Sequence, residues 1–255
     1  MMKDLYSFHS TQADLDDFYK KAADAYHKIF KRCGLDAIYT VAAGGVFTEK
    51  FTHEFQVVAD VGEDTIYICD KCGYSENKEI TKLKADDKCP NCDGKITENK
   101  SIEVGNIFDQ GIKYSEALGL DFADETGNKK PVIMGAYGIG LGRVMATAIE
   151  IHHDDRGIIW PEEIAPFKVH LISLAGKNEE AGKVYNDLQK KGIEVLFDDR
   201  EDKAPGEKFA DADLIGCPIR LVISNKTLAQ NSIELKYRNK KEFELVKLDK
   251  LTEAL

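Results

Sequence analysis

The sequence predicts an α+β protein with two domains, and three features lead to this prediction. The stretch MGAYGIGLGRVMATAIE, residues 134–150, carries four glycines ahead of an apolar helix. Two close pairs of cysteines stand in the first half of the chain. From Val169 onward, short apolar strands alternate with amphipathic helices, which is typical of a small α/β sheet with both faces covered. We therefore expect a core domain over residues 1–164, with a ribbon inserted at about 65–98, and an α/β domain over 165–255.

The first domain is expected to contain one amphipathic helix followed by strands. Thr11 and Asp14 form a Thr-x-x-Asp pattern that indicates a helix start, and Gly34 ends the helix. Between them, aromatic and aliphatic residues recur at helical spacing, so they are expected to form core rather than a ligand pocket. Strands are predicted at 51–59, 101–108 and 131–134, with a loop and a short helix at 111–118.

The cysteine pairs Cys69-x-x-Cys72 and Cys89-x-x-Cys92 predict a metal site. Two such knuckles can bring four thiolates to the corners of one tetrahedron about Zn²⁺. Because four bound sulfurs leave no open position for water, the zinc is expected to be structural and to drive local folding. Four free cysteines paired by chance are the alternative.

The glycine-rich stretch predicts a ligand site where a strand turns into a helix. Glycines let a backbone approach a ligand, and a helix N-terminus offers unpaired N–H groups that favour anions. Arg143, expected in the first turns of the helix, adds a planar cation that can hold a phosphate through two donors. The stretch is therefore interpreted as a site for phosphate or an adenine ring, with a glycine-rich turn and a surface arginine as the alternative.

The second domain is predicted from alternating elements. Pro161 and Pro166 mark a connector. Strands are expected at 169–174, 193–198 and 219–223, helices at 178–190 and 208–215, and a final hairpin at 233–237 and 243–246 before a short C-terminal helix.

Composition limits the classes of function. The chain is 43% hydrophobic, contains no run of about 18 apolar residues and lacks a signal-peptide pattern at residues 1–10, so a globular, cytoplasmic protein is expected. The net charge is −10, yet from Lys168 onward 16 basic residues balance 16 acidic ones. This balance argues against a sequence-blind nucleic-acid coat, although a few placed cations could still read one RNA.

Several segments resemble bacterial prolyl-tRNA synthetases. EIHHDDRGIIWPEEIAPFKV, residues 150–169, is similar to the third signature motif of class II aminoacyl-tRNA synthetases in the version found in that family. MKDLYSF, HEFQVVADVGED, IEVGNIFDQGIKYSEA and DDREDKAPGEKFADADLIGCPIRLVIS match further family segments. The resemblance covers nearly the whole chain. It implies a partial class II antiparallel-sheet catalytic core, here with an inserted zinc ribbon, followed by an α/β anticodon-binding domain.

The resemblance also implies an activity and a set of site residues. The family activates proline with ATP and passes it to the terminal ribose of its tRNA, with Mg²⁺ and arginines neutralising charge. Arg143 would hold the γ-phosphate and Glu103 would join it as a catalytic residue. Glu103 and Asn106 would meet ATP or its metal, Asn106 standing where many relatives have histidine. Gly138 and Gly140 would shape the adenine side.

The remaining implied residues bind proline and tRNA. Proline would lie against Asp4, Tyr6, His53 and Phe108. The anticodon of proline-tRNA would be read by Arg200, Glu207, Lys208 and Asp211.

The chain departs from the family pattern in two places, and each departure changes the activity that is expected of it. The sequence begins at MMKD, without the first motif that builds the family's homodimer interface and without the arginine-bearing strand of the second. A C-terminal fragment that needs a missing N-terminal part is therefore expected, and either a separate fragment supplies that part in trans or the sequence is a truncated gene product. The zinc ribbon stands where many bacterial members insert an editing domain, so correction of mischarged alanyl-tRNA would fall to a separate protein.

Two other classes of function compete with the ligase. One is a non-catalytic, synthetase-like RNA-binding or regulatory paralogue, which the missing N-terminal motifs favour and the retained Arg143, Glu103 and glycines oppose. The other is a zinc-ribbon nucleic-acid module with an unrelated α/β domain, which leaves the matching segments between them unexplained.

Overall fold

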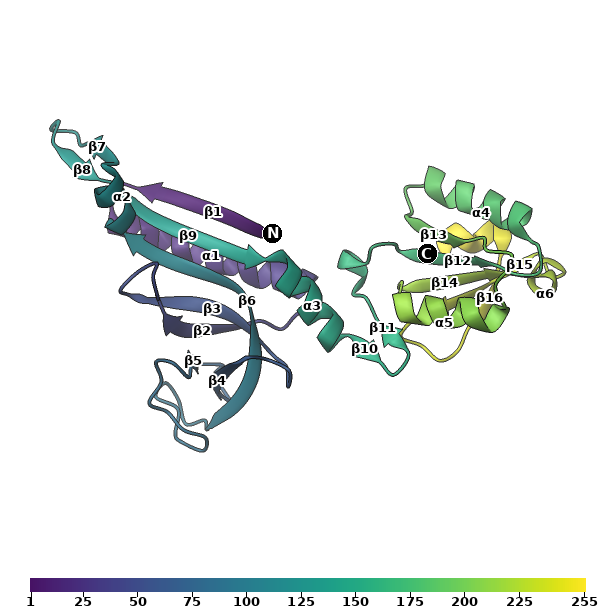
Figure 1. Cartoon of the computed structure of the whole chain (residues 1–255), viewed down its shortest axis with the longest axis horizontal. Helices are drawn as coiled ribbons and strands as arrows, with labels where there is room; N and C mark the ends of the chain where they lie inside the picture. The colour runs from purple at the N-terminus through teal and green to yellow at the C-terminus, as the bar shows by residue number, and fades with distance from the viewer. The chain divides into compact units, whose positions relative to one another are not determined.

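A computed structural model describes residues 1–255 and divides them into two compact units, Met1–Ile151 and His152–Leu255 (Figure 1). The division falls earlier than the expected boundary at 164–165. Residues 152–164 belong with the second unit because Arg238 donates two hydrogen bonds to the Asp154 carboxylate, at 2.9 and 2.7 Å. Arg156 also pairs with Asp213 at 2.8 Å. None of the helices combines the length and apolar character that crossing a membrane requires.

The first unit is built on a seven-stranded sheet with the order β1-β9-β6-β3-β2-β5-β4. Its neighbouring strands are antiparallel except for β2 and β5, which meet in parallel. A small hairpin, β7–β8, and three helices complete it. The elements are β1 (Met2–His9), α1 (Gln12–Arg32), β2 (Ile38–Ala43), β3 (Phe51–Val58), β4 (Asp64–Cys69), β5 (Ser75–Asn77), β6 (Ile96–Gly111), α2 (Lys113–Leu118), β7 (Asp121–Ala123), β8 (Lys129–Pro131), β9 (Ile133–Gly140) and α3 (Leu141–Ile151).

Helix α1 covers one face of the central strands (Figure 1). The Thr11 side chain accepts a hydrogen bond from the Asp14 N–H at 3.2 Å, so the predicted start is confirmed. Tyr26 and Phe30 are buried and pack around Phe55 of β3. The expectation that this aromatic stripe forms core is also confirmed.

The structure corrects the placement of the glycine-rich stretch. Three of its glycines, Gly135, Gly138 and Gly140, lie inside β9, and the helix begins only at Leu141. The strand continues this far because β9 is hydrogen-bonded on both edges, to β1 and to β6. Gly135 and Gly138 therefore belong to the sheet floor, whereas Gly140 and Gly142 lie on either side of Leu141, the first residue of α3.

The second unit contains a five-stranded sheet with the order β13-β12-β14-β15-β16. β12 runs parallel to β13 and β14, and the last two strands are antiparallel. The elements are β10 (His153–Asp154), β11 (Gly157–Ile158), η1 (Glu162–Ile164), β12 (Val169–Ser173), α4 (Asn178–Lys190), β13 (Val195–Asp198), α5 (Pro205–Ile215), β14 (Ile219–Ile223), α6 (Asn225–Leu228), β15 (Ser232–Tyr237), β16 (Glu244–Lys247) and η2 (Leu248–Glu253).

The faces of this sheet are covered by α4 on one side and α5 on the other (Figure 1). Leu171 and Leu188 belong to the core beneath α4, whereas Ile172 packs with Ala212 of α5. This is the covered α/β sheet that the alternating pattern predicts. Helix α5 starts at Pro205, earlier than the expected Lys208, because proline is well suited to the first position of a helix.

Candidate functional site

A cleft in the first unit gathers side chains from β1, β6 and β9 and from the start of α3. Eight of the nine residues expected to hold ATP or proline line this cleft. They are Asp4, Tyr6, Glu103, Asn106, Phe108, Gly138, Gly140 and Arg143.

Strand register explains why these residues converge. Glu54 lies opposite Asn106, Asn106 opposite Gly138, and Gly138 opposite Asp4, so these four positions form one row across four strands. Side chains alternate between the faces of a sheet, and residues in one row share a face. The row therefore runs across the face that carries the cleft. An added Cβ at Gly138 would meet no atom closer than 3.4 Å, so its bare backbone is open to the cleft.

Arg143 and Glu103 form an ion pair at one end of the cleft. Nη1 of Arg143 donates to Oε2 of Glu103 at 2.7 Å and to its backbone oxygen at 2.9 Å. Burial raises the pKa of the Glu103 carboxyl, although Arg143 opposes this rise. Arg143 is 46% exposed and its guanidinium suits a phosphate, while the carboxylate suits a divalent cation.

Glu54 is a buried carboxyl that sequence reasoning did not single out as a site residue. It accepts hydrogen bonds from Gln56 Nε2 at 2.9 Å and from Asn77 Nδ2 at 3.0 Å. Burial raises its pKa to about 7, against the opposing effect of these amide donors. Only the register places it beside Asn106 and the cleft, because the sequence does not show which strands are neighbours.

The structure does not bring His53 into the cleft with the other expected proline-binding residues. His53 lies one residue before Glu54 on β3, so its side chain points to the opposite face. There its ring stacks on Tyr39, with centroids 4.2 Å apart, and its Nδ1 is 2.9 Å from the Tyr19 hydroxyl of α1. Burial lowers its pKa to about 4. The assignment of His53 to the proline side is corrected to a packing role beneath α1.

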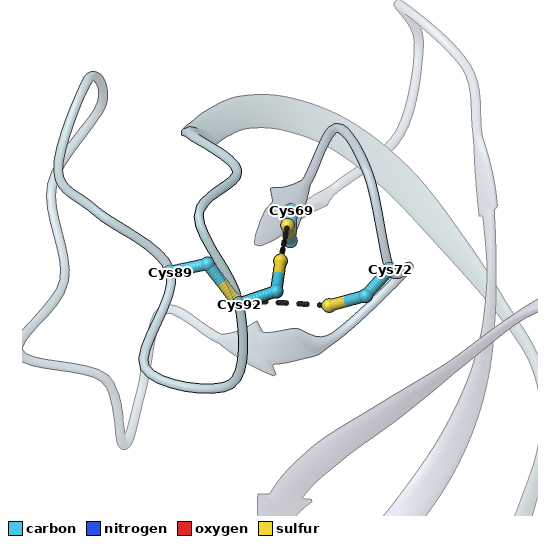
Figure 2. A group of neighbouring side chains, drawn as sticks. All are labelled: Cys69, Cys72, Cys89 and Cys92. Carbon is cyan, nitrogen blue, oxygen red and sulfur yellow. Dashed lines mark hydrogen bonds between the residues drawn. The ribbon is translucent and has the colours of Figure 1, made fainter.

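The four cysteines of the ribbon converge on one point (Figure 2). Their sulfur atoms all lie within 4.8 Å of one another, with Cys69 and Cys92 at 3.4 Å and Cys72 and Cys89 at 3.7 Å. Zinc–sulfur bonds of about 2.3 Å in a tetrahedron place the sulfurs about 3.8 Å apart, whereas a disulfide needs about 2.05 Å. These sulfurs therefore fit one metal ion and form no disulfide.

Backbone N–H groups donate hydrogen bonds to the sulfur atoms of this cluster. The N–H groups of Lys71, Asn91 and Gly94 each donate to a cysteine sulfur at 3.3 to 3.4 Å. Amide donors, Cys72 N–H first and then Lys71 N–H, lower the pKa of the Cys69 thiol to about 6. The pKa values of Cys72 and Cys92 are raised, because their own amide donors are outweighed by burial and neighbouring thiols. Thiolates are the zinc-binding form, so the donor set fits Zn²⁺.

The residues expected to read an anticodon occupy different environments in the second unit. Arg200 holds Asp198 through Nε at 2.9 Å and Nη2 at 2.8 Å, and Nη2 also reaches Asp211 at 2.8 Å. This arginine lowers the pKa of Asp198 to about 2. Glu207 is paired with Lys203 at 2.6 Å on the surface. Arg200, Asp211 and Glu207 all remain accessible.

Lys208 is the exception among them. Its side chain is only 3% exposed, and Nζ donates to the backbone oxygen of Ser173 at 2.8 Å. Nζ also lies 3.3 Å from the backbone oxygen of Asp198 and 3.4 Å from its Oδ1. Helix α5 turns Lys208 inward to join the ends of β12 and β13, so the structure shows a structural link here, and a contact of Lys208 with RNA stays a prediction.

A cavity at the carboxyl ends of β12, β13 and β14 contains further polar residues that sequence reasoning missed. Lys203, Asn225, Lys226 and Glu234 line it beside Arg200. In open α/β sheets, this end of the parallel strands is where ligands bind. The sequence offered no motif for these residues, since one loop, helix α6 and strand β15 contribute them.

Comparison with known proteins agrees with this architecture. Residues 1–152 match the family model described as the tRNA synthetase class II core domain (G, H, P, S and T), and residues 168–255 match the anticodon binding domain. The chain is 31% identical over 405 residues to a proline–tRNA ligase of Dehalococcoides mccartyi (strain CBDB1), covering all of this chain and 71% of that protein. The chain belongs to the proline–tRNA ligase family.

Other members of the proline–tRNA ligase family align differently. The ligase of Rickettsia akari (strain Hartford) is 38% identical over 270 residues, which cover 98% of this chain and 62% of that protein. The alignment with the Dehalococcoides ligase spans 405 positions, although this chain has only 255 residues. The Dehalococcoides ligase therefore carries a long segment that has no counterpart in this chain. The two family models match residues 1–152 and 168–255, so both domains belong to synthetase families. This excludes a zinc-ribbon module joined to an unrelated α/β domain.

Proposed function

We propose that this chain is the ATP-, proline- and anticodon-binding part of a proline–tRNA ligase. The observation that carries the proposal is the single cleft that collects eight expected ligand-binding residues. In the first reaction, a proline carboxylate oxygen attacks the α-phosphorus of ATP, and the bond to pyrophosphate breaks as the prolyl-adenylate forms. Such a step needs positioning and charge neutralisation and no side-chain nucleophile.

Each end of the cleft suits one part of this reaction. Arg143 provides the fork of donors for a phosphate, and Glu103 provides a carboxylate for Mg²⁺ that would accompany ATP. The bare backbone at Gly138 and Gly140 suits a flat adenine ring. Asp4 provides a negative charge for the ammonium of proline, with Tyr6 and Phe108 as apolar walls.

The second unit supplies the tRNA contacts in this proposal. RNA loops are recognised by hydrogen bonds to exposed base edges and by stacking on planar groups such as guanidinium. Arg200 and Asp211, with Asn225 and Glu234 in the neighbouring cavity, offer such groups. The ribbon, with one structural Zn²⁺ on its four cysteines, completes the set of bound groups.

A further polypeptide segment is proposed to complete the cleft on the side of β1. β1 is an edge strand, and its residues Tyr6, which lines the cleft, and Phe8 are 54% and 57% exposed. Edge strands with exposed apolar residues are suited to pairing with another strand. The donor would be an N-terminal part of the ligase, supplied in cis or in trans, and the family's homodimer would form through it.

The test is ATP–pyrophosphate exchange that depends on proline, measured with this chain alone and with the N-terminal segment of a relative added. We expect weak exchange alone and a clear gain with the segment. Arg143→Ala should lower exchange by about 10²-fold, Arg143→Lys by less, and Lys129→Ala, outside the cleft, not at all. Binding of proline-tRNA without ATP binding in any of these mixtures would instead support the non-catalytic RNA-binding paralogue.

A further inference from the structure

One residue of the cleft comes from a loop and not from the sheet. Phe47 lies in the segment 44–50 between β2 and β3, and its ring packs on that of Phe108 with centroids 4.7 Å apart and planes inclined by 41°. Tyr6 lines the same cleft from β1. Phe47 is still 43% exposed, so much of its ring remains available to contact a ligand.

The loop is built so that Phe47 is held in this place. A Cβ on Gly44 would lie 2.4 Å from the Thr48 backbone oxygen, and Gly45 has φ = +54°, so both positions require glycine. The N–H groups of Phe47 and Thr48 both donate to the Gly44 oxygen, at 3.0 and 3.3 Å. The turn therefore fixes the backbone from which the Phe47 ring projects.

Two cations attach the loop to the wall of the cleft. Lys113 of α2 donates from Nζ to the Val46 oxygen at 2.7 Å, and Lys50 pairs with Asp109 of β6 at 2.5 Å. A single exposed aromatic residue on a surface needs no explanation. Phe47 differs because a glycine turn and two charged contacts together hold its ring over Phe108, inside the cleft.

We infer that Phe47 is a specificity-determining residue that closes the apolar side of the amino-acid pocket. The inference rests on the proposed function, and it names which side chain distinguishes proline from alanine. The pyrrolidine ring packs against the exposed part of the Phe47 ring, and its C–H groups next to the cationic nitrogen are attracted to aromatic faces. Alanine lacks two of these carbons and leaves its contacts with Phe47 unmade, which weakens its binding.

The experiment compares two non-hydrolysable acyl-adenylate analogues, prolyl- and alanyl-sulfamoyl-adenosine, by titration calorimetry with the full chain and the added N-terminal segment of a relative. Phe47→Ala should weaken the prolyl analogue about three- to tenfold and the alanyl analogue less than about twofold. Phe47→Tyr keeps the ring and should restore the wild-type ratio. Val46→Ala is the matched control, since Val46 is 76% exposed in the same loop and does not line the cleft.

The outcomes separate this inference from the proposed function. Suppose that the wild-type chain binds the prolyl analogue and that Phe47→Ala weakens both analogues equally. That result would overturn the role of Phe47 in specificity and leave the proposed function standing. A loss of equal size in Val46→Ala would do the same, because it would reflect the loop and not the ring. If the wild-type chain binds neither analogue with the N-terminal segment of a relative added, the proposed function fails together with this inference.

Discussion

Replacing Lys208 by methionine tests directly whether this residue links strand ends or contacts RNA. Lys208 was expected to read RNA, but Nζ lies among the backbone oxygens of Ser173 and Asp198 and the Asp198 carboxylate. Methionine fills much of the same volume and donates no hydrogen bond. The substitution therefore leaves two buried carbonyl groups and part of one carboxylate without their partner.

The size of the effect follows from these contacts. Removing one member of a buried ion pair costs about 3 to 5 kcal/mol. Arg200 still holds Asp198 through two hydrogen bonds in the variant, so we take the lower end, about 3 kcal/mol. For a unit of this size, that loss lowers the unfolding midpoint by roughly 12–20 °C.

The single tryptophan of the chain makes the assay specific for the second unit. Trp160 donates from Nε1 to the Ile215 oxygen at 3.0 Å, at the end of the helix that carries Lys208. Urea and thermal unfolding followed by tryptophan fluorescence should show the loss in Lys208→Met. Lys203→Met is the control, because Lys203 pairs with Glu207 on the surface and such pairs contribute less than about 1 kcal/mol.

The reasoning is refuted by a Lys208→Met variant that unfolds like Lys203→Met. It is also refuted if folded Lys208→Met loses affinity for proline-tRNA while its stability is unchanged. Either result would show that Nζ is available to RNA and is not a link between strand ends.

Three further predictions concern the ribbon, the cleft and the anticodon residues. The reduced chain should hold one equivalent of zinc by elemental analysis, and Cys72→Ser should release it; less than half an equivalent in wild type would contradict the site. Because burial raises the pKa of folded Glu54 to about 7, from an ordinary value of 4.5, its contribution to the free energy of unfolding is complete below pH 4.5 and is lost as the pH rises through 7. Glu54→Gln should therefore gain stability relative to wild type across that range in urea titrations, and a constant difference would disprove the assignment. Arg200→Ala should weaken binding of proline-tRNA in filter assays while other tRNAs are barely affected, whereas equal weakening for all tRNAs would point to phosphate contact.

Local sequence patterns were sufficient to predict several features of this protein. The cysteine spacing predicted a cluster whose four sulfurs the structure brings within 4.8 Å, because each knuckle is a short turn whose shape depends on its own residues. The observed bounds of α4 and β14 agree with the bounds predicted from the sequence, because hydrophobic periodicity and glycine breaks define both elements. Arg143 and Glu103 were expected together from the resemblance, and they form an ion pair.

Register and long-range packing decided the rest. His53 and Glu54 are adjacent in sequence, but the pairing of β3 with β6 places Glu54 on the face that carries the cleft and His53 on the face covered by α1. The glycines of β9 resembled a helix mouth because the sequence does not show that two strands hydrogen-bond to them.

The sequence also does not show which charged side chains are buried or which distant residues a loop contacts. Lys208 lies in a charged segment, and only the meeting of α5 with the ends of β12 and β13 places its amine among backbone oxygens. Phe47 gave no signal because its partner, Phe108, is distant in the chain. The sequence by itself therefore determined most local elements, the cysteine cluster and the family. The tertiary structure decided which faces those residues occupy, since that depends on contacts between segments far apart in the chain.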